Sequence, residues 1–97
     1  MNMQAMLRQA QQMQKDMLKA QEEINNTDFI GQNGLVKVTV SGDKKVKNVE
    51  IDKNFEIDDV DMVQDMIVVA INDAMSQIDK VTEQKLGKYT KGVPGLF

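Results

Sequence analysis

The side chains that most enzymes use for chemistry are largely missing from this sequence. The chain contains no cysteine and no histidine, which excludes disulfides, Cys/His zinc sites and imidazole acid–base catalysis. Ser41 and Ser76 therefore have no histidine to activate them as nucleophiles. We expect no catalytic residue, no cofactor and no metal, and we expect that the protein is not an enzyme.

Two short motifs resemble ligand sites but fit structural roles better. Asp58, Asp59 and Asp61 lack the spacing and the distal glutamate of a calcium-binding loop, whereas aspartates just before a helix cap its N-terminus. The GQNG segment at residues 31–34 is followed neither by the Lys-Ser/Thr pair nor by the helix of a phosphate-binding loop. The sequence thus predicts a helix cap and a turn.

Charge is distributed unevenly along the chain. The net charge is −3, seven acids and no base lie between residues 55 and 79, and residues 80–97 carry four lysines against one glutamate. Nonspecific nucleic-acid binding depends on neutralising phosphates with Lys and Arg, so the overall negative charge disfavours coating a polyanion. Any contact with nucleic acid must use a local basic patch.

The elements that would position such a patch begin with a helix over residues 3–24. Apolar residues recur there at alternating spacings of three and four, which is a heptad pattern, and Gly and Pro are absent before Gly31. The stripe is made mainly of soft or small side chains, so it suits packing on another helix of the same chain or of a partner. A promiscuous binding groove is the alternative interpretation. The stripe consists of Met3, Met6, Ala10, Met13, Met17, Ala20 and Ile24.

A three-stranded antiparallel meander should follow this helix. Asn33-Gly34 is a strong hairpin signal, and residues 35–41 alternate with Val36, Val38 and Val40 on one face. Residues 42–45 turn the chain again into a strand over 46–51. In that strand we expect Val49 and Ile51 to face inward with Lys47, and Asn48 and Glu50 to face outward with Val46.

A second helix of about 25 residues is predicted from Val63 to about Lys88 by apolar residues three and four positions apart. At 1.5 Å per residue it would be about 38 Å long, longer than a compact domain of this size. The helices must then project and expose apolar surface, which favours a homodimer. If they pack antiparallel, Arg8 comes close to Lys85, Lys88 and Lys91. Residues 1–88 should form one domain, and residues 89–97 a flexible C-terminal tail.

The whole chain resembles the YbaB/EbfC family of bacterial nucleoid-associated proteins. The resemblance lies in the combination of LRQAQQMQKDMLKAQEEI, GLVKVTVSGDKKVKNVEID, DMIVVAINDAM and the terminal PGLF. It implies an α+β fold of order α-β-β-β-α, with a three-stranded antiparallel sheet, two long projecting helices and a tweezer-like homodimer. It also implies binding of double-stranded DNA and a role in nucleoid organisation or regulation of gene expression. We expect the protein in the cytoplasm and nucleoid, and we expect no membrane partner.

The resemblance places the DNA contacts on the projecting helices, by element rather than by motif. The alternative is a dimeric, non-enzymatic protein that docks a protein partner of DNA replication or repair through its acidic second helix. The DNA-binding candidates are Arg8, Lys15, Lys19, Lys80, Lys85, Lys88 and Lys91. The candidates for dimer or helix packing are Met3, Met6, Met13, Met17, Ile24, Val36, Val38, Val40, Met66, Ile67, Ala70 and Ala74.

Overall fold

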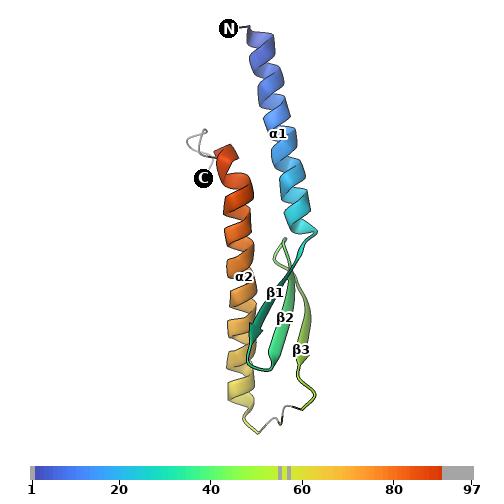
Figure 1. Ribbon diagram of the computed structural model, residues 1–97, viewed down its shortest axis with the longest axis vertical. Coiled ribbons are helices and arrows are strands. Elements are labelled where there is room, and N and C mark those ends of the chain that lie inside the picture. Colours follow the sequence, from blue (N-terminus) through green and yellow to red (C-terminus); the bar gives the residue numbers. More distant parts are fainter. Residues whose placement is uncertain (1, 55, 57, 91–97) are drawn as a thin grey trace.

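The molecule is an elongated α-β-β-β-α structure, as the sequence predicts (Figure 1). The computed structural model describes residues 2–54, 56 and 58–90. Its elements are α1 (Met3–Asn25), β1 (Asp28–Asn33), β2 (Val36–Ser41), β3 (Val46–Ile51) and α2 (Val60–Thr90). The strands form one antiparallel sheet in the order β1-β2-β3, and the molecule measures 69 × 22 × 14 Å. Of the tail expected at residues 89–97, residues 89 and 90 belong to α2 and the rest lie outside the described residues.

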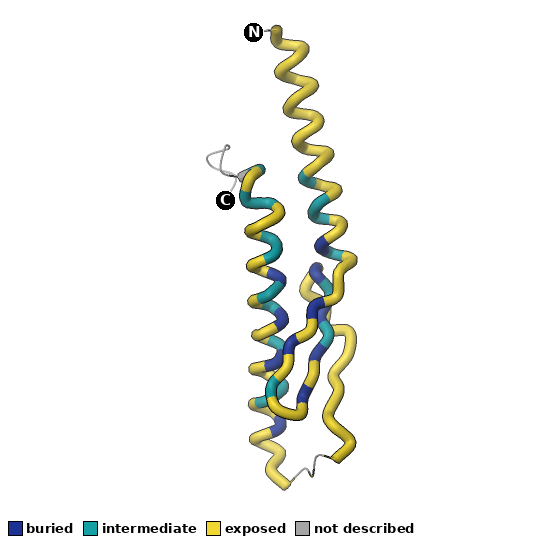
Figure 2. The backbone as a smooth tube through the Cα atoms, in the orientation of Figure 1, coloured by how far each residue is buried: buried dark blue, intermediate teal, exposed yellow. Residues whose placement is uncertain are grey.

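The core lies between α2 and one face of β1 and β2. Val36, Val38 and Val40 are completely buried, as the alternation of this strand predicts, and they pack with Ala70, Ala74 and Ile78 of α2 together with Phe29. Figure 2 shows these buried positions along the contact between the helix and the two strands. Small side chains on α2 let its backbone come close to the sheet, which fixes the helix against β1 and β2.

Gly31 makes this close approach possible on the side of the sheet. A Cβ atom added to Gly31 would lie 1.9 Å from the backbone oxygen of Ala70. Two side chains of α2 then reach the free edge of β1: Asp73 accepts a hydrogen bond from the Gln32 amide (3.3 Å), and Gln77 donates one to the Ile30 carbonyl (2.8 Å). These contacts occupy backbone groups at which another strand could otherwise pair.

The C-terminal end of α1 is fixed to the turn between β2 and β3. Ile24 is buried, and a Cβ atom added to Gly42 would lie 1.7 Å from the backbone oxygen of Ile24. The Gly42 amide also donates to the Thr27 carbonyl at 2.9 Å. From this anchor α1 runs antiparallel to α2, and its N-terminal part extends past the C-terminal end of α2 (Figure 1).

Three local predictions need correction. The first hairpin loop is Gly34-Leu35 rather than Asn33-Gly34, because Asn33 still pairs with Val36 and only Gly34 takes a positive φ (57°), which fits a type II′ turn. The second helix begins earlier, at Val60, because Asp59 caps it. It also continues through Gly87 to Thr90, since one glycine costs a helix only about 1 kcal/mol.

The third correction concerns β3. A register shift pairs Thr39 with Asn48 but Val40 with Val46, so Lys47 is the extra residue of a β-bulge. Val46 consequently shares the inner face with Val40, and Lys47 reaches Asp28 at 3.0 Å. The whole of β3 is exposed, because α2 covers β1 and β2 and not this strand.

Candidate nucleic-acid interface

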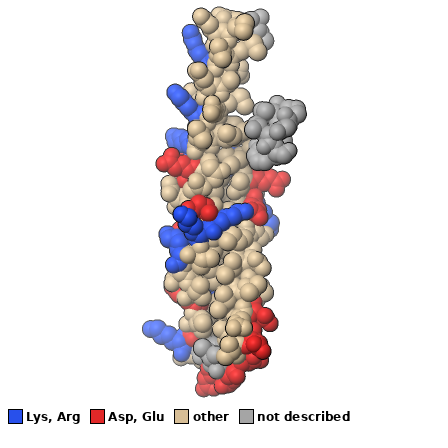
Figure 3. Space-filling view, turned by 180° about the vertical axis from the view of Figure 1, so that it is seen from behind, with Lys and Arg blue, Asp and Glu red and all other residues tan. Residues whose placement is uncertain are grey.

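Three basic residues of α1 form a straight row along one side of the helix. Arg8, Lys15 and Lys19 are separated by seven and four positions, so they lie within about 40° of one another around the helix and span about 16 Å. All three are exposed, and within the described part of the chain none of them forms an ion pair. We call this row the α1 basic row. Figure 3 shows Lys and Arg side chains following one another along one edge of the upper, α1 end of the molecule.

The α1 basic row faces away from the packing side of its own helix. The half-buried or buried residues of α1 that lie toward α2 are Met17, Ala20 and Ile24, which are on the opposite side of the helix from Lys15 and Lys19. No acidic residue precedes Asp16 in the chain. Arg8 is therefore the one charged residue in the N-terminal half of α1, whereas Lys15 and Lys19 have Asp16, Glu22 and Glu23 near them in the chain.

The lysines of α2 lie near its C-terminal end but not on one side of the helix, because Lys80 and Lys85 are about 140° apart around its axis. Lys80, Lys85 and Lys88 are exposed, and the Lys88 ammonium lies 5.0 Å from the centroid of the Tyr89 ring, a cation–π distance. The two helices are staggered, and the first half-buried residue of α1 is Met17. Arg8 lies nine positions earlier, about 14 Å further along the helix, within its exposed N-terminal half (residues 3–14), which we call the arm. Lys91 lies outside the described residues.

The opposite end of the molecule is acidic. Figure 3 shows Asp and Glu side chains gathered there, around the start of α2. Asp59 accepts a hydrogen bond from the Met62 amide at 3.2 Å, which confirms that an aspartate of this cluster caps the helix. Among the described residues, no group of three acidic side chains is arranged to hold a metal ion. Electrostatic repulsion disfavours contact between this end and a polyanion.

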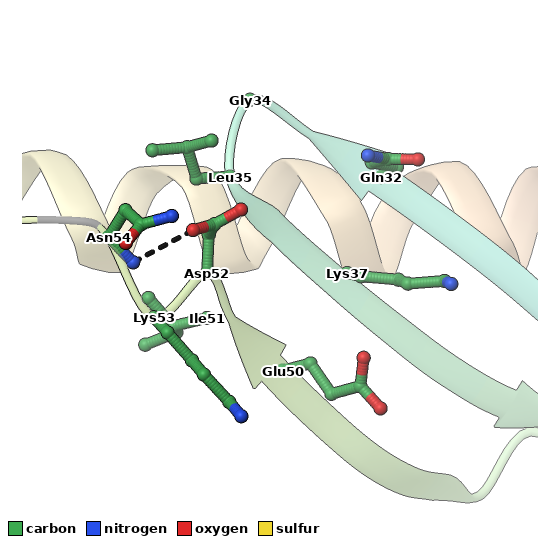
Figure 4. A pocket seen from close by; sticks show the side chains of 9 residues that line it. All are labelled: Gln32, Gly34, Leu35, Lys37, Glu50, Ile51, Asp52, Lys53 and Asn54. Carbon is green, nitrogen blue, oxygen red and sulfur yellow. Dashed lines mark hydrogen bonds between the residues drawn. The ribbon is translucent and has the colours of Figure 1, made fainter.

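A shallow hollow of about 520 Å³ lies on the sheet near the β1–β2 turn (Figure 4). Its charges are mixed, since Lys37 and Lys53 stand beside Glu50 and Asp52, and Figure 4 shows that these side chains do not converge on one point. The hydrogen bond drawn there joins the Asn54 amide to the Asp52 carboxylate at 2.8 Å and closes a local turn. The hollow thus contains no nucleophile with an activating base. It is lined by Gln32, Gly34, Leu35, Lys37, Glu50, Ile51, Asp52, Lys53 and Asn54.

The residues expected to pack fall into three environments in the structure. Ile24, Val36, Val38, Val40, Ala70 and Ala74 are buried, Met17, Met66 and Ile67 are half-buried, and Met3, Met6 and Met13 are exposed.

An apolar face that the sequence prediction leaves out lies beside the core. It consists of the inner face of β3 and the side of α2 turned away from Asp73 and Gln77, and we call it the uncovered face. The signal that could have revealed it is the run of six consecutive apolar residues at 66–71. A helix that packs on a single side requires an apolar stripe, whereas a continuous run places apolar residues on its other sides as well. Its members are Val46, Val49, Ile51, Val68, Ile71 and Met75, all exposed or half-buried.

A projecting helix that presents a row of basic side chains from a small α+β body is typical of a nucleic-acid-binding protein. Comparison with known proteins identifies the family. The model of the YbaB/EbfC DNA-binding family matches residues 1–93, and the chain belongs to this family. It is a nucleoid-associated DNA-binding protein without enzymatic activity.

Similar bacterial proteins have the same description, and the similarity extends over nearly the whole chain. A "Nucleoid-associated protein" of Enterococcus faecalis is 50% identical over 98 residues, which cover 98% of this chain and 94% of the relative. One from Lactococcus lactis subsp. cremoris is 53% identical, covering 97% of this chain and 98% of the relative.

A solved structure shares the fold. The crystal structure of an uncharacterized protein from Helicobacter pylori matches with a TM-score of 0.72 at 18% identity, over 93% of this chain and 97% of that one. In the part of the chain that the structure describes, no helix is long and apolar enough to cross a membrane.

Proposed function

We propose that this protein binds double-stranded DNA as a homodimer, through its projecting helices, and that it organises the nucleoid or regulates gene expression. The observation that carries the proposal is the α1 basic row, which lies opposite the packing side of its helix and whose first member, Arg8, is eight positions from the nearest acid, Asp16. Lys80, Lys85 and Lys88 of α2 add further phosphate contacts. A row of one arginine and two lysines suits backbone phosphates, which position a protein on DNA without reading its sequence.

A homodimer accounts for the uncovered face. Val49 and Ile51 are exposed although they share the inner face of the sheet with fully buried valines, and the adjoining side of α2 is also apolar. The free edge of β1 is occupied by Asp73 and Gln77, whereas β3 lies at the other edge with its inner side bare. A second copy that placed the same surface against this one would bury both in an isologous contact.

The DNA part of the proposal is tested by fluorescence anisotropy of a labelled duplex at 50 and 200 mM salt. With about six phosphate contacts per dimer, affinity should fall roughly a thousandfold between these concentrations. Charge reversal of the α1 basic row (Arg8→Glu/Lys15→Glu) and of α2 (Lys85→Glu/Lys88→Glu) should each abolish binding at 200 mM. The matched control is Lys37→Glu/Lys53→Glu, which makes the same change in net charge on the sheet. If the control weakens binding as much as the helix variants, overall charge and not the helices determines affinity.

The dimer part is tested by light scattering on the purified protein. Wild type should have twice the chain mass, and Val49→Glu, which places a charge on the uncovered face, should give the mass of one chain. Ile30→Glu is the control, because Ile30 is equally exposed but lies on the outer face of the sheet. A dimeric Val49→Glu variant, or a monomeric wild type, would contradict this assignment.

The alternative, docking of a protein partner through the acidic side of α2, is favoured by the absence of basic residues between 55 and 79. Two aspartates of α2 already have partners in the body: Asp73 accepts a hydrogen bond at the edge of β1, and Asp79 pairs with Lys44 at 3.0 Å. The clean test is therefore Asp61→Lys/Asp65→Lys. Loss of a protein partner with unchanged DNA affinity would support the alternative.

A further inference from the structure

The apolar stripe of α1 continues beyond the segment that packs against α2. In the C-terminal third of the helix Met17 and Ala20 are half-buried and Ile24 is buried. The same heptad series continues toward the N-terminus, where Met3, Met6 and Met13 are 77%, 50% and 43% exposed. Figure 2 shows this upper part of α1 exposed throughout, while burial begins only in its lower part. The apolar stripe is thus covered at the C-terminal end of α1 and exposed at its N-terminal end, and we call the exposed part the open stripe.

The residues that flank the open part of the stripe are neutral. Leu7, Gln9 and Gln14 occupy the positions that border a helix–helix seam, where charges decide which partners are accepted. Arg8 and Lys15 lie on the opposite side of the helix. Two copies of this helix could therefore bring their stripes together without placing like charges in contact, and each would keep its basic row free.

We propose that the open stripe of one arm pairs with the same stripe on an arm of another dimer, so that the protein bridges two segments of DNA. This inference rests on the proposed DNA-binding function. Arms that meet from opposite DNA segments run antiparallel, which places Met3 opposite Met13 and Met6 opposite Ala10 of the other copy.

The open stripe spans about one and a half heptads, and helical contacts of this length are marginal in free solution. Binding along DNA raises the local concentration of arms, so pairing and bridging become favourable there.

Bridging is measured by immobilising one biotinylated duplex and counting a second, fluorescent duplex recovered with it. Wild type should recover the second duplex at protein concentrations that saturate the first. The variant Met6→Gln/Met13→Gln should reduce this recovery at least tenfold, while the anisotropy affinity for a single duplex changes less than twofold. Leu18→Gln is the control, because Leu18 is an exposed apolar residue outside the stripe. Full bridging by the double variant would overturn the inference. A double variant that has the mass of one chain in light scattering would also overturn it, because the stripe would then be part of the dimer contact.

A second measurement tests the pairing itself and does not require DNA binding. The chain has no cysteine, so the single variants Met6→Cys and Ala10→Cys can be mixed at high concentration and oxidised. A disulfide between the two variants should form at least fivefold faster than between Leu18→Cys and Ala10→Cys. Equal rates would overturn the arm pairing. If wild type fails to bind a single duplex, the proposed function is overturned. The rate of disulfide formation then still tests whether the arms pair.

Discussion

The body of the molecule and its N-terminal arm are held in shape by different forces. In the body, α2 lies so close to the sheet that Gly31 has no room for a Cβ atom, and three valines of β2 are fully buried. In the first half of α1 every described residue is exposed, and the helix depends on its own backbone hydrogen bonds, its cap and the helix propensity of its Gln, Ala and Met residues. Packing thus specifies the body, whereas local propensity specifies the arm and leaves its surface free for binding.

Among substitutions that test this difference, the largest loss of stability is expected at Gly31. Gly31→Ala would push the Ala70 backbone away and should lower the free energy of unfolding by about 3–5 kcal/mol. Gly87→Ala makes the same change in α2 where the nearest side-chain atom is 4.0 Å from the added Cβ, and it should raise stability by up to about 1 kcal/mol. Urea unfolding at one fixed protein concentration measures both. Equal losses in the two variants would show that the close approach at Gly31 is not what sets the cost.

Truncating one apolar residue in each region sharpens the comparison. Ile78→Ala leaves a cavity in the core and should cost about 2–5 kcal/mol, whereas Met13→Ala in the arm should change the free energy of unfolding by less than about 0.5 kcal/mol. Urea unfolding without DNA is again the measurement. A loss at Met13 as large as that at Ile78 would mean that the arm is already packed in the free protein.

The elements of the fold follow from the sequence because their patterns are local. A heptad series, a strand that alternates valine with polar residues and an i, i+3/i+4 series each need only neighbouring residues, and all three elements are present. The order of the strands follows from short turns, since consecutive strands joined by a few residues pair as hairpins.

Features that depend on distant contacts could not be predicted in this way. The bulge that turns Val46 inward becomes visible only when β3 is paired with β2, and the need for glycine at position 31 only when α2 lies on it. For the site, the spacing of Arg8, Lys15 and Lys19 on one helix is local, but the stagger between α1 and α2 is not. The stagger depends on how α1 is anchored at Gly42, a contact between distant parts of the chain.

A smaller effect is expected at the N-terminus of the arm. Asn2 caps α1 by accepting a hydrogen bond from the Gln4 amide at 2.9 Å. Asn2→Ala should destabilise the first turns by about 1 kcal/mol, and Asn2→Ser should restore them. Amide hydrogen exchange should accelerate about fivefold over residues 3–10 and remain unchanged in β2, because the arm and the body do not share packing. Faster exchange in β2 as well would show that the two regions unfold together.

The smallest effect is expected in the β2–β3 turn, at Asp43, which belongs to the body but is exposed. The Ser41 hydroxyl donates a hydrogen bond to the Asp43 carboxylate, and this bond, with help from Lys45 at 3.6 Å, holds the pKa of Asp43 below its ordinary value of 3.8. A depressed carboxyl pKa stabilises the folded state above the unfolded value, and that stability is lost as pH falls through the folded pKa. Ser41→Ala should therefore be slightly less stable than wild type at pH 6 and lose this difference near pH 2, while Asp43→Asn should show no such convergence. Thermal unfolding across this pH range measures it. A difference that persisted unchanged to pH 2 would assign the effect of Ser41 to its second hydrogen bond, to the Lys45 carbonyl, rather than to the charge of Asp43.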